Sequence, residues 1–148
     1  MGNTKLKCMQ KHKTILVVED DSDDRELLLD ALQTSSDVVE VRLAESGVDA
    51  MDYLSQQLSA KAPLPCLIVL DLNMPYMNGK DTFHKIKSDS NLKEIPVVIF
   101  TSSMNPNDKE FYKSYGVEPI SKPFEYSEME AIINRMLEKC GKTLHDKF

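Results

Sequence analysis

The chain has 148 residues, of which 41% are hydrophobic and 28% are charged, and its 18 Lys and Arg against 24 Asp and Glu leave a net charge of −6. This composition suits one globular domain, excludes a wholly disordered chain and disfavours a protein that holds nucleic acid by charge. There is no apolar run of 18 residues and no apolar signal-peptide core near the N-terminus, so the sequence predicts neither a transmembrane helix nor membrane binding.

Short apolar runs alternate with helical patterns along the chain. Continuous runs at residues 14–18, 66–70 and 97–100 predict strands that are covered on both faces. Apolar and polar residues alternate in part over 38–43, which indicates a strand with one more solvent-exposed face, near an edge of the sheet. Residues 119–121 are a weaker fifth candidate, because Pro119 confines a strand to an edge or a loop.

Helices are expected between these strands. Capping residues predict where three of them begin: Asp23 with Glu26 three residues later, Ser46, and Asn105 followed by Pro106. The last helix carries the clearest apolar stripe, which we interpret as core packing: Met129, Ile132, Ile133, Met136 and Leu137. Gly141 is expected to end this helix.

Five strands that alternate with five helices predict an α/β protein with a doubly wound parallel sheet. Right-handed crossovers favour the flavodoxin-like (βα)5 arrangement with strand order 2-1-3-4-5. We expect an N-terminal extension at 1–13, one domain at 14–140 and a C-terminal tail at 141–148. In such sheets, ligands bind at the carboxyl ends of the strands.

The three cysteines do not suggest a disulfide framework, because they are odd in number and far apart: Cys8, Cys66 and Cys140. Cys66 heads an apolar run and is expected to be a small buried hydrophobic residue. Free thiols are typical of a reducing compartment. We therefore expect a cytoplasmic protein.

Polar residues follow the predicted strands at the carboxyl edge: Asp20 and Asp21 after the first, Asp71 after the third, Thr101 after the fourth and Lys122 after the fifth. Carboxylates a few ångströms apart repel one another by about 1 kcal/mol per pair in water and roughly 4 kcal/mol near a protein surface. A divalent cation would relieve this repulsion. Carboxylate and carbonyl oxygens are hard ligands, which favours Mg²⁺ over zinc.

Phosphoryl transfer to a carboxylate fits this set of groups. Asp71 would be the nucleophile that forms an aspartyl-phosphate. Mg²⁺ and Lys122 would neutralise the phosphoryl oxygens, and the Thr101 hydroxyl would donate a hydrogen bond to one of them. Each residue alone has an ordinary structural explanation, since acidic residues after strands often serve helix N-termini. Their joint placement at one edge of the sheet supports the hypothesis.

The chain from about residue 14 to 140 resembles the receiver domain of bacterial two-component response regulators. The resemblance rests on four motifs in order, at residues 15–21, 70–75 with Asn78-Gly79 behind them, 95–101 and 121–124. The stretch between the second and third strands resembles stand-alone receivers associated with bacterial phytochrome kinases.

The resemblance implies a role for each site residue. Asp71 would be the phosphoacceptor. Asp21, Asp71 and the backbone carbonyl of Asn73 would bind Mg²⁺ directly, and Asp20 would bind it through water.

Beyond the metal, Thr101 and Lys122 would sense and stabilise the phosphoryl group, and Pro123 would follow a cis peptide. The family places an aromatic residue three positions before its lysine, where this chain has Pro119. We therefore expect the switch that couples this ring to Thr101 to be absent or rerouted.

The expected function is that of a phosphoacceptor rather than an enzyme. It would receive a phosphoryl group from a sensor histidine kinase or phosphotransfer protein and signal through protein–protein contacts, with a homodimer formed through the last helix and its neighbouring strand. The alternative is a phosphorylation-independent interaction module, which Pro119 favours. A Mg²⁺-dependent phosphatase is disfavoured because Asn73 occupies the position of its acid.

Overall fold

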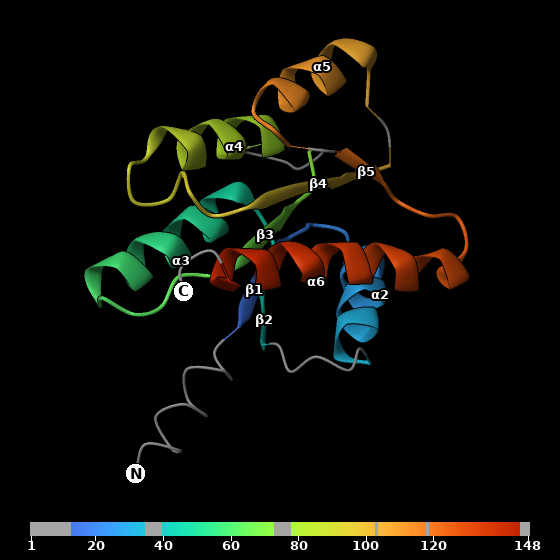
Figure 1. The fold of residues 1–148 in the computed structure, drawn as a ribbon, viewed down its shortest axis with the longest axis horizontal. Coiled ribbons are helices and arrows are strands. Elements are labelled where there is room, and N and C mark those ends of the chain that lie inside the picture. The colour runs from blue at the N-terminus through green and yellow to red at the C-terminus, as the bar shows by residue number, and fades with distance from the viewer. Residues whose placement is uncertain (1–12, 35–39, 73–77, 103, 118, 146–148) are drawn as a thin grey trace.

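The fold is a five-stranded parallel sheet between two layers of helices (Figure 1). The structure, a computed structural model, describes residues 13–34, 40–72, 78–102, 104–117 and 119–145. Its strands are β1 (Thr14–Val18), β2 (Glu40–Ala44), β3 (Leu67–Leu70), β4 (Val97–Thr101) and β5 (Pro119–Ser121), in the order β2-β1-β3-β4-β5. This order and the edge positions of β2 and β5 confirm the predicted sheet.

The helices divide between the two faces of the sheet. They are α2 (Ser22–Gln33), α3 (Gly47–Ser59), α4 (Gly79–Ser88), α5 (Pro106–Ser114) and α6 (Met129–His145), with a short 3₁₀ helix η1 (Tyr126–Glu128). One core cluster joins the sheet to α2 and α6, and the other joins it to α3, α4 and α5. Among the described residues, no helix is long and apolar enough to cross a bilayer.

Two of the three predicted helix starts are confirmed. The Ser46 hydroxyl accepts a hydrogen bond from the backbone N–H of Asp49, and the Asn105 side chain accepts one from that of Asp108. The third was placed two residues too late. Asp21, and not Asp23, caps α2, because the chain stays extended through Asp21 before it turns into the helix.

The apolar stripe of α6 faces the sheet as predicted. Met129, Ile133 and Met136 are buried in the core that α6 shares with α2. The helix, however, continues through Gly141 to His145, so the prediction that Gly141 ends it is wrong. A glycine inside a helix costs only about 1 kcal/mol relative to alanine, which the rest of a long helix can offset.

A disulfide joins Cys66, directly before β3, to Cys140 on α6. This finding contradicts the expectation that no disulfide forms. The two cysteines are 74 positions apart in sequence, but their Cα atoms lie 5.0 Å apart, a normal separation for a bridge. Packing of α6 on the central strand brings them together, which sequence spacing alone does not reveal.

Candidate functional site

The parallel register of the sheet brings the predicted site residues to one edge. Asp71 follows β3, and its backbone N–H donates to the carbonyl of Val18, the last residue of β1. On the other side, the backbone N–H of Lys122 donates to the carbonyl of Thr101 at 2.9 Å. The ends of β1, β3, β4 and β5 therefore meet where the sequence predicted a site.

Three carboxylates gather at this edge. Glu19, Asp20 and Asp71 each offer an oxygen atom, and these atoms all lie within 4.8 Å of one another. Glu19 and Asp71 are 3% and 5% exposed, whereas Asp20 faces solvent. Three hard oxygen ligands with one open side form a cluster suited to a divalent cation.

The acidic cluster differs by one residue from the predicted set. Asp21 was expected to bind the metal directly, but its Oδ1 accepts hydrogen bonds from the backbone N–H groups of Asp23 at 2.9 Å and Asp24 at 3.1 Å. Asp21 thus caps the N-terminus of α2 through this oxygen atom, and Glu19 takes part in the acidic cluster. Glu19 comes directly after the buried run of β1, which is the signal that could have revealed it. Asn73, the predicted carbonyl ligand, lies outside the described residues.

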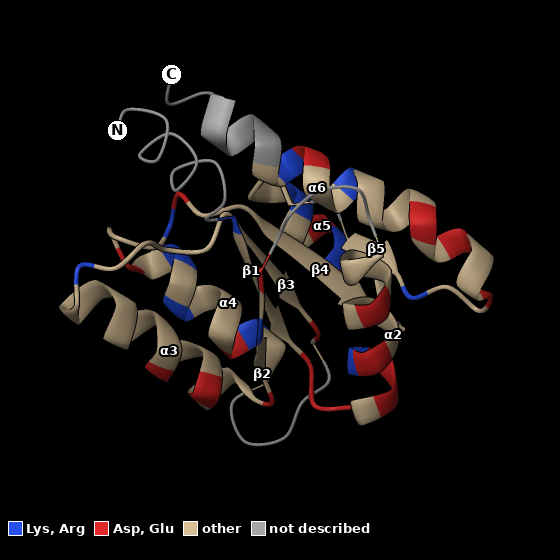
Figure 2. Ribbon diagram, turned by 90° about the horizontal axis from the view of Figure 1, so that it is seen from below, with Lys and Arg blue, Asp and Glu red and all other residues tan. Residues whose placement is uncertain are grey.

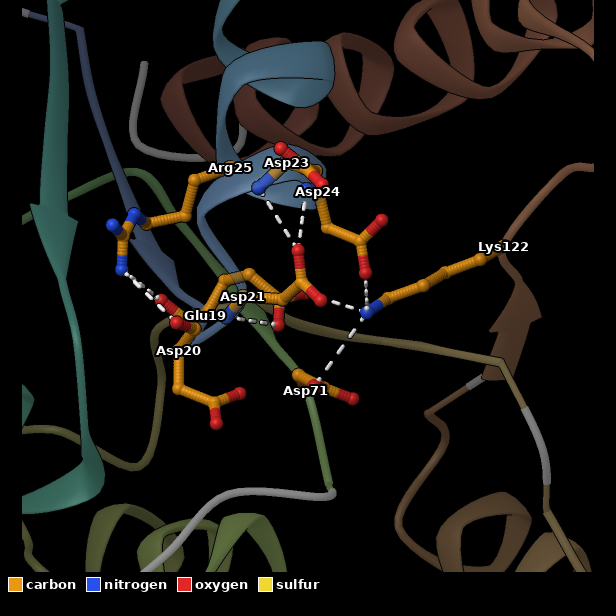
Figure 3. Close-up of polar contacts among 8 residues, drawn as sticks. All are labelled: Glu19, Asp20, Asp21, Asp23, Asp24, Arg25, Asp71 and Lys122. Atoms are coloured by element: carbon orange, nitrogen blue, oxygen red, sulfur yellow. Dashed lines mark hydrogen bonds and ion pairs between the residues drawn. The ribbon is translucent and has the colours of Figure 1, made fainter.

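Arg25 holds the segment that carries these acids. Its Nη1 donates to the carbonyl oxygens of Glu19 at 3.1 Å and Asp20 at 3.3 Å (Figure 3). Its Nη2 lies 3.7 Å from a carboxylate oxygen of Glu45, which follows β2. These contacts tie the turn between β1 and α2 to the first turns of the helix. Arg25 therefore supports the orientation of Glu19 and Asp20 without itself belonging to the acidic cluster.

The ammonium group of Lys122 lies among three carboxylates (Figure 3). Its Nζ is 2.7 Å from Glu19, 2.8 Å from Asp24 and 3.5 Å from Asp71. The Lys122 side chain is only 12% exposed, which makes these pairs stronger than ordinary surface contacts. Asp24, on α2, is a site residue that sequence reasoning missed, because 98 positions separate it from Lys122.

Burial and charge shift the pKa values of this group in opposite ways. Burial is the main cause that raises the pKa of Glu19 to about 7. The hydrogen bond from Lys122 lowers this pKa, and the nearby Asp71 raises it. Burial by itself would lower the pKa of Lys122, but its hydrogen bonds to Asp24 and Glu19 and the nearby charges raise it. Lys122 is therefore a permanent cation, whereas Glu19 changes its charge near neutral pH.

Thr101 and Pro119 lie at the positions that the sequence predicted. Thr101 ends β4, is 2% exposed and pairs in register with Ser121. Pro119 begins the edge strand β5 opposite Ile99, so no aromatic ring stands three residues before Lys122. The described peptide bonds are all trans, so the cis bond expected before Pro123 is not present; trans is also the lower-energy form of such a bond.

The order of the sheet, the acidic cluster at its carboxyl edge and the lysine beside it define a receiver domain. The family described as response regulator receiver domain matches residues 15–134, and the chain belongs to this family.

Particular relatives refine this assignment. The response regulator Rcp1 of Synechocystis sp. is 41% identical over 97 residues, which cover 65% of this chain and 66% of Rcp1. The structure is similar to that of a phosphorylated cyanobacterial phytochrome response regulator, RcpA, with a TM-score of 0.76, 38% identity and coverage of 86% of this chain and 92% of RcpA. The bacteriophytochrome response regulator AtBRR gives a TM-score of 0.71 at 30% identity, with coverage of 88% and 93%.

Coverage of the curated relatives is incomplete. The match spans just under two thirds of Rcp1 and 52% of the response regulator Rre1 of Synechocystis sp., which is 31% identical over 85% of this chain. A solved structure of Rcp1 in its Mn²⁺-bound form is also similar, with a TM-score of 0.73, 34% identity and coverage of 82% of this chain and 88% of Rcp1.

Proposed function

We propose that this chain is a signalling receiver that accepts a phosphoryl group on Asp71 in the presence of Mg²⁺. The observation that carries the proposal is the position of Lys122, whose Nζ lies 3.5 Å from Asp71 at the border of the acidic cluster. A nucleophilic carboxylate, a fixed cation and a set of hard ligands at one point are the groups that phosphoryl transfer to a carboxylate needs.

The residues present fit a divalent metal. Glu19, Asp20 and Asp71 supply only oxygen atoms, which suits Mg²⁺ better than a metal that prefers nitrogen or sulfur. The similar response regulator Rcp1 has been solved in a Mn²⁺-bound form, which supports the binding of a divalent cation by this chain. When bound, the metal would neutralise charge on the transferred group.

The chain's own residues then have distinct tasks. A carboxylate oxygen of Asp71 forms a bond to phosphorus, while the bond from phosphorus to the donor's nitrogen or oxygen breaks and the donor keeps the electron pair. Lys122 pairs with a phosphoryl oxygen, and the Thr101 hydroxyl donates to another. The protein catalyses only its own modification and turns over no separate substrate.

The proposed donor is a sensor histidine kinase or a phosphotransfer protein. The similar structures of RcpA and AtBRR are phytochrome response regulators, which points to a kinase of the phytochrome class as the partner. The output would be a change in affinity for another protein. A homodimer through α6 and β5 stays a prediction; the buried Met129, Ile133 and Met136 face the sheet, so such a contact would use the other faces of α6.

Pro119 favours one alternative, a receiver-fold module that binds partners independently of phosphorylation. Intact-mass measurement after incubation with Mg²⁺ and acetyl phosphate separates the two. We expect the wild type to gain one phosphoryl group and Asp71→Asn to gain none. An unmodified wild type that remains folded would favour the alternative.

A further inference from the structure

Asp24 is the one neighbour of Lys122, among the three carboxylates described above, that stands outside the acidic cluster. Glu19 and Asp71 both belong to the cluster, whereas Asp24 projects from the first turn of α2. It holds the Lys122 Nζ at 2.8 Å, much closer than Asp71 does at 3.5 Å. Figure 3 shows Lys122 reaching across from β5 to meet it.

An ammonium group has three N–H donors, and all three have a carboxylate within reach. Phosphorylation of Asp71 would bring further anionic oxygens to the same ammonium group. The hydrogen bond and the charge that Lys122 gives to Asp24 are then less available to those oxygens. α2 and the segment that leads into it already carry several acidic residues (Figure 2), so Asp24 adds to a negative field that an anionic phosphodonor must enter.

We propose that Asp24 is a positioning residue that competes with the phosphoryl group for Lys122 and thereby slows phosphorylation and weakens the phosphorylated state. This inference rests on the proposed function and assigns a regulatory contact within it. Asp24 is about a third exposed, so water and salt screen its charge. The competition is therefore modest and sensitive to ionic strength.

The test compares Asp24→Asn with Asp23→Asn. Both variants remove one negative charge from the first turn of α2, but the Asp23 side chain is exposed and is absent from the group around Lys122. The measurements are the initial rate of phosphoryl uptake from acetyl phosphate with Mg²⁺, by intact mass, and the affinity for beryllofluoride, a phosphoryl mimic that requires no donor chemistry. Asp24→Glu, which restores the charge, is the conservative variant.

We expect Asp24→Asn to raise the rate and the beryllofluoride affinity by roughly two- to five-fold, the range of a partly exposed ion pair. The gain should shrink as salt is raised, which a purely structural role would not cause. Asp23→Asn should change both quantities by less, and Asp24→Glu should be close to the wild type.

The possible failures are distinguishable. A wild type that takes up no phosphoryl group contradicts the proposed function. If the wild type is phosphorylated but Asp24→Asn equals Asp23→Asn, or is slower than the wild type, Asp24 does not compete for Lys122 and the inference is overturned. If Asp24→Asn unfolds, Asp24→Ser is measured in its place, with the unfolding midpoint of each variant as the check.

Discussion

Gly79, at the start of α4, lies directly against the backbone of Asp71. A Cβ atom at this position would come within 2.5 Å of the Leu72 Cα and closer still to the carbonyl oxygen of Asp71. The backbone N–H of Gly79 also donates to the Leu72 carbonyl at 3.1 Å. The absence of a side chain at residue 79 therefore lets the start of α4 pack on the end of β3, where it supports the proposed phosphoacceptor.

Gly79→Ala should displace Asp71 and lower both stability and metal affinity. Overpacking at such a contact costs roughly 1–3 kcal/mol of unfolding free energy, which urea unfolding measures, and calorimetric titration with Mg²⁺ reports the site. Gly116→Ala is the control, because residue 116 has a φ of +73° and open space around it. It should reduce stability by roughly 1–2 kcal/mol, because a Cβ is disfavoured at positive φ, and leave Mg²⁺ binding unchanged. Equal Mg²⁺ affinity in the two variants would contradict this prediction.

Asp20 and Asp21 should respond differently to the same substitution. Asp20→Asn removes a carboxylate from the acidic cluster and should weaken Mg²⁺ binding by about ten-fold or more. Asp21→Asn should leave Mg²⁺ binding near the wild-type value, and stability too, since Asn caps a helix about as well as Asp. Calorimetric titration measures the Mg²⁺ affinity of the two variants. A comparable loss of affinity in both would show that Asp21 binds the metal, as predicted from the sequence.

Asp21→Ala completes this comparison. It removes the acceptor of the hydrogen bonds from Asp23 and Asp24 and should lower the free energy of unfolding by about 1 kcal/mol. A stability unchanged in urea unfolding would show that the cap contributes nothing.

The metal-free protein should lose stability between about pH 4.5 and 7. The pKa of Glu19 is raised from 4.5 to about 7, primarily by burial, so the folded state keeps a proton that the unfolded chain releases across this interval. The free energy of unfolding therefore falls as pH rises, by on the order of 3 kcal/mol in total. Below pH 4.5 the free energy of unfolding keeps its full value with respect to Glu19, and above pH 7 it stays at the lower value.

Urea unfolding in the presence of a chelator, at several values between pH 4 and 8, measures this slope. Glu19→Gln cannot titrate and should flatten it. A stability that rises from pH 4.5 to 7 in the wild type, or a slope that is identical in Glu19→Gln, would show that Glu19 is not the group responsible.

The Cys66–Cys140 disulfide can be counted chemically. Alkylation of the denatured, unreduced protein should label one cysteine, Cys8, and alkylation after reduction should label all three. Closing a loop of this length stabilises a protein by up to about 4 kcal/mol in the chain-entropy description, so reductant should lower the unfolding midpoint. The double variant Cys66→Ala, Cys140→Ala should be insensitive to reductant. Three thiols in the unreduced wild type would show that the cysteines remain free.

Much of the fold follows from local sequence patterns. Buried runs such as that of β3 and the apolar stripe of α6 predict their elements, because burial on both faces or on one face imposes a particular hydrophobic period. Ser46 and Asn105 mark helix starts through hydrogen bonds to nearby backbone N–H groups. The alternation of strands and helices then restricts the topology to few choices, and these place Asp71, Thr101 and Lys122 at one edge.

Only the tertiary structure decided which acidic side chains face the site. Residues 19–21 are three consecutive acids, and their directions depend on the point at which β1 ends and α2 begins. A shift of one residue exchanges a buried cluster member, Glu19, for a helix cap, Asp21. The sequence also did not predict two long-range contacts, that of Asp24 with Lys122 and the disulfide between Cys66 and Cys140. Both are formed by packing between elements that are distant in sequence, and no local sequence pattern indicates such packing.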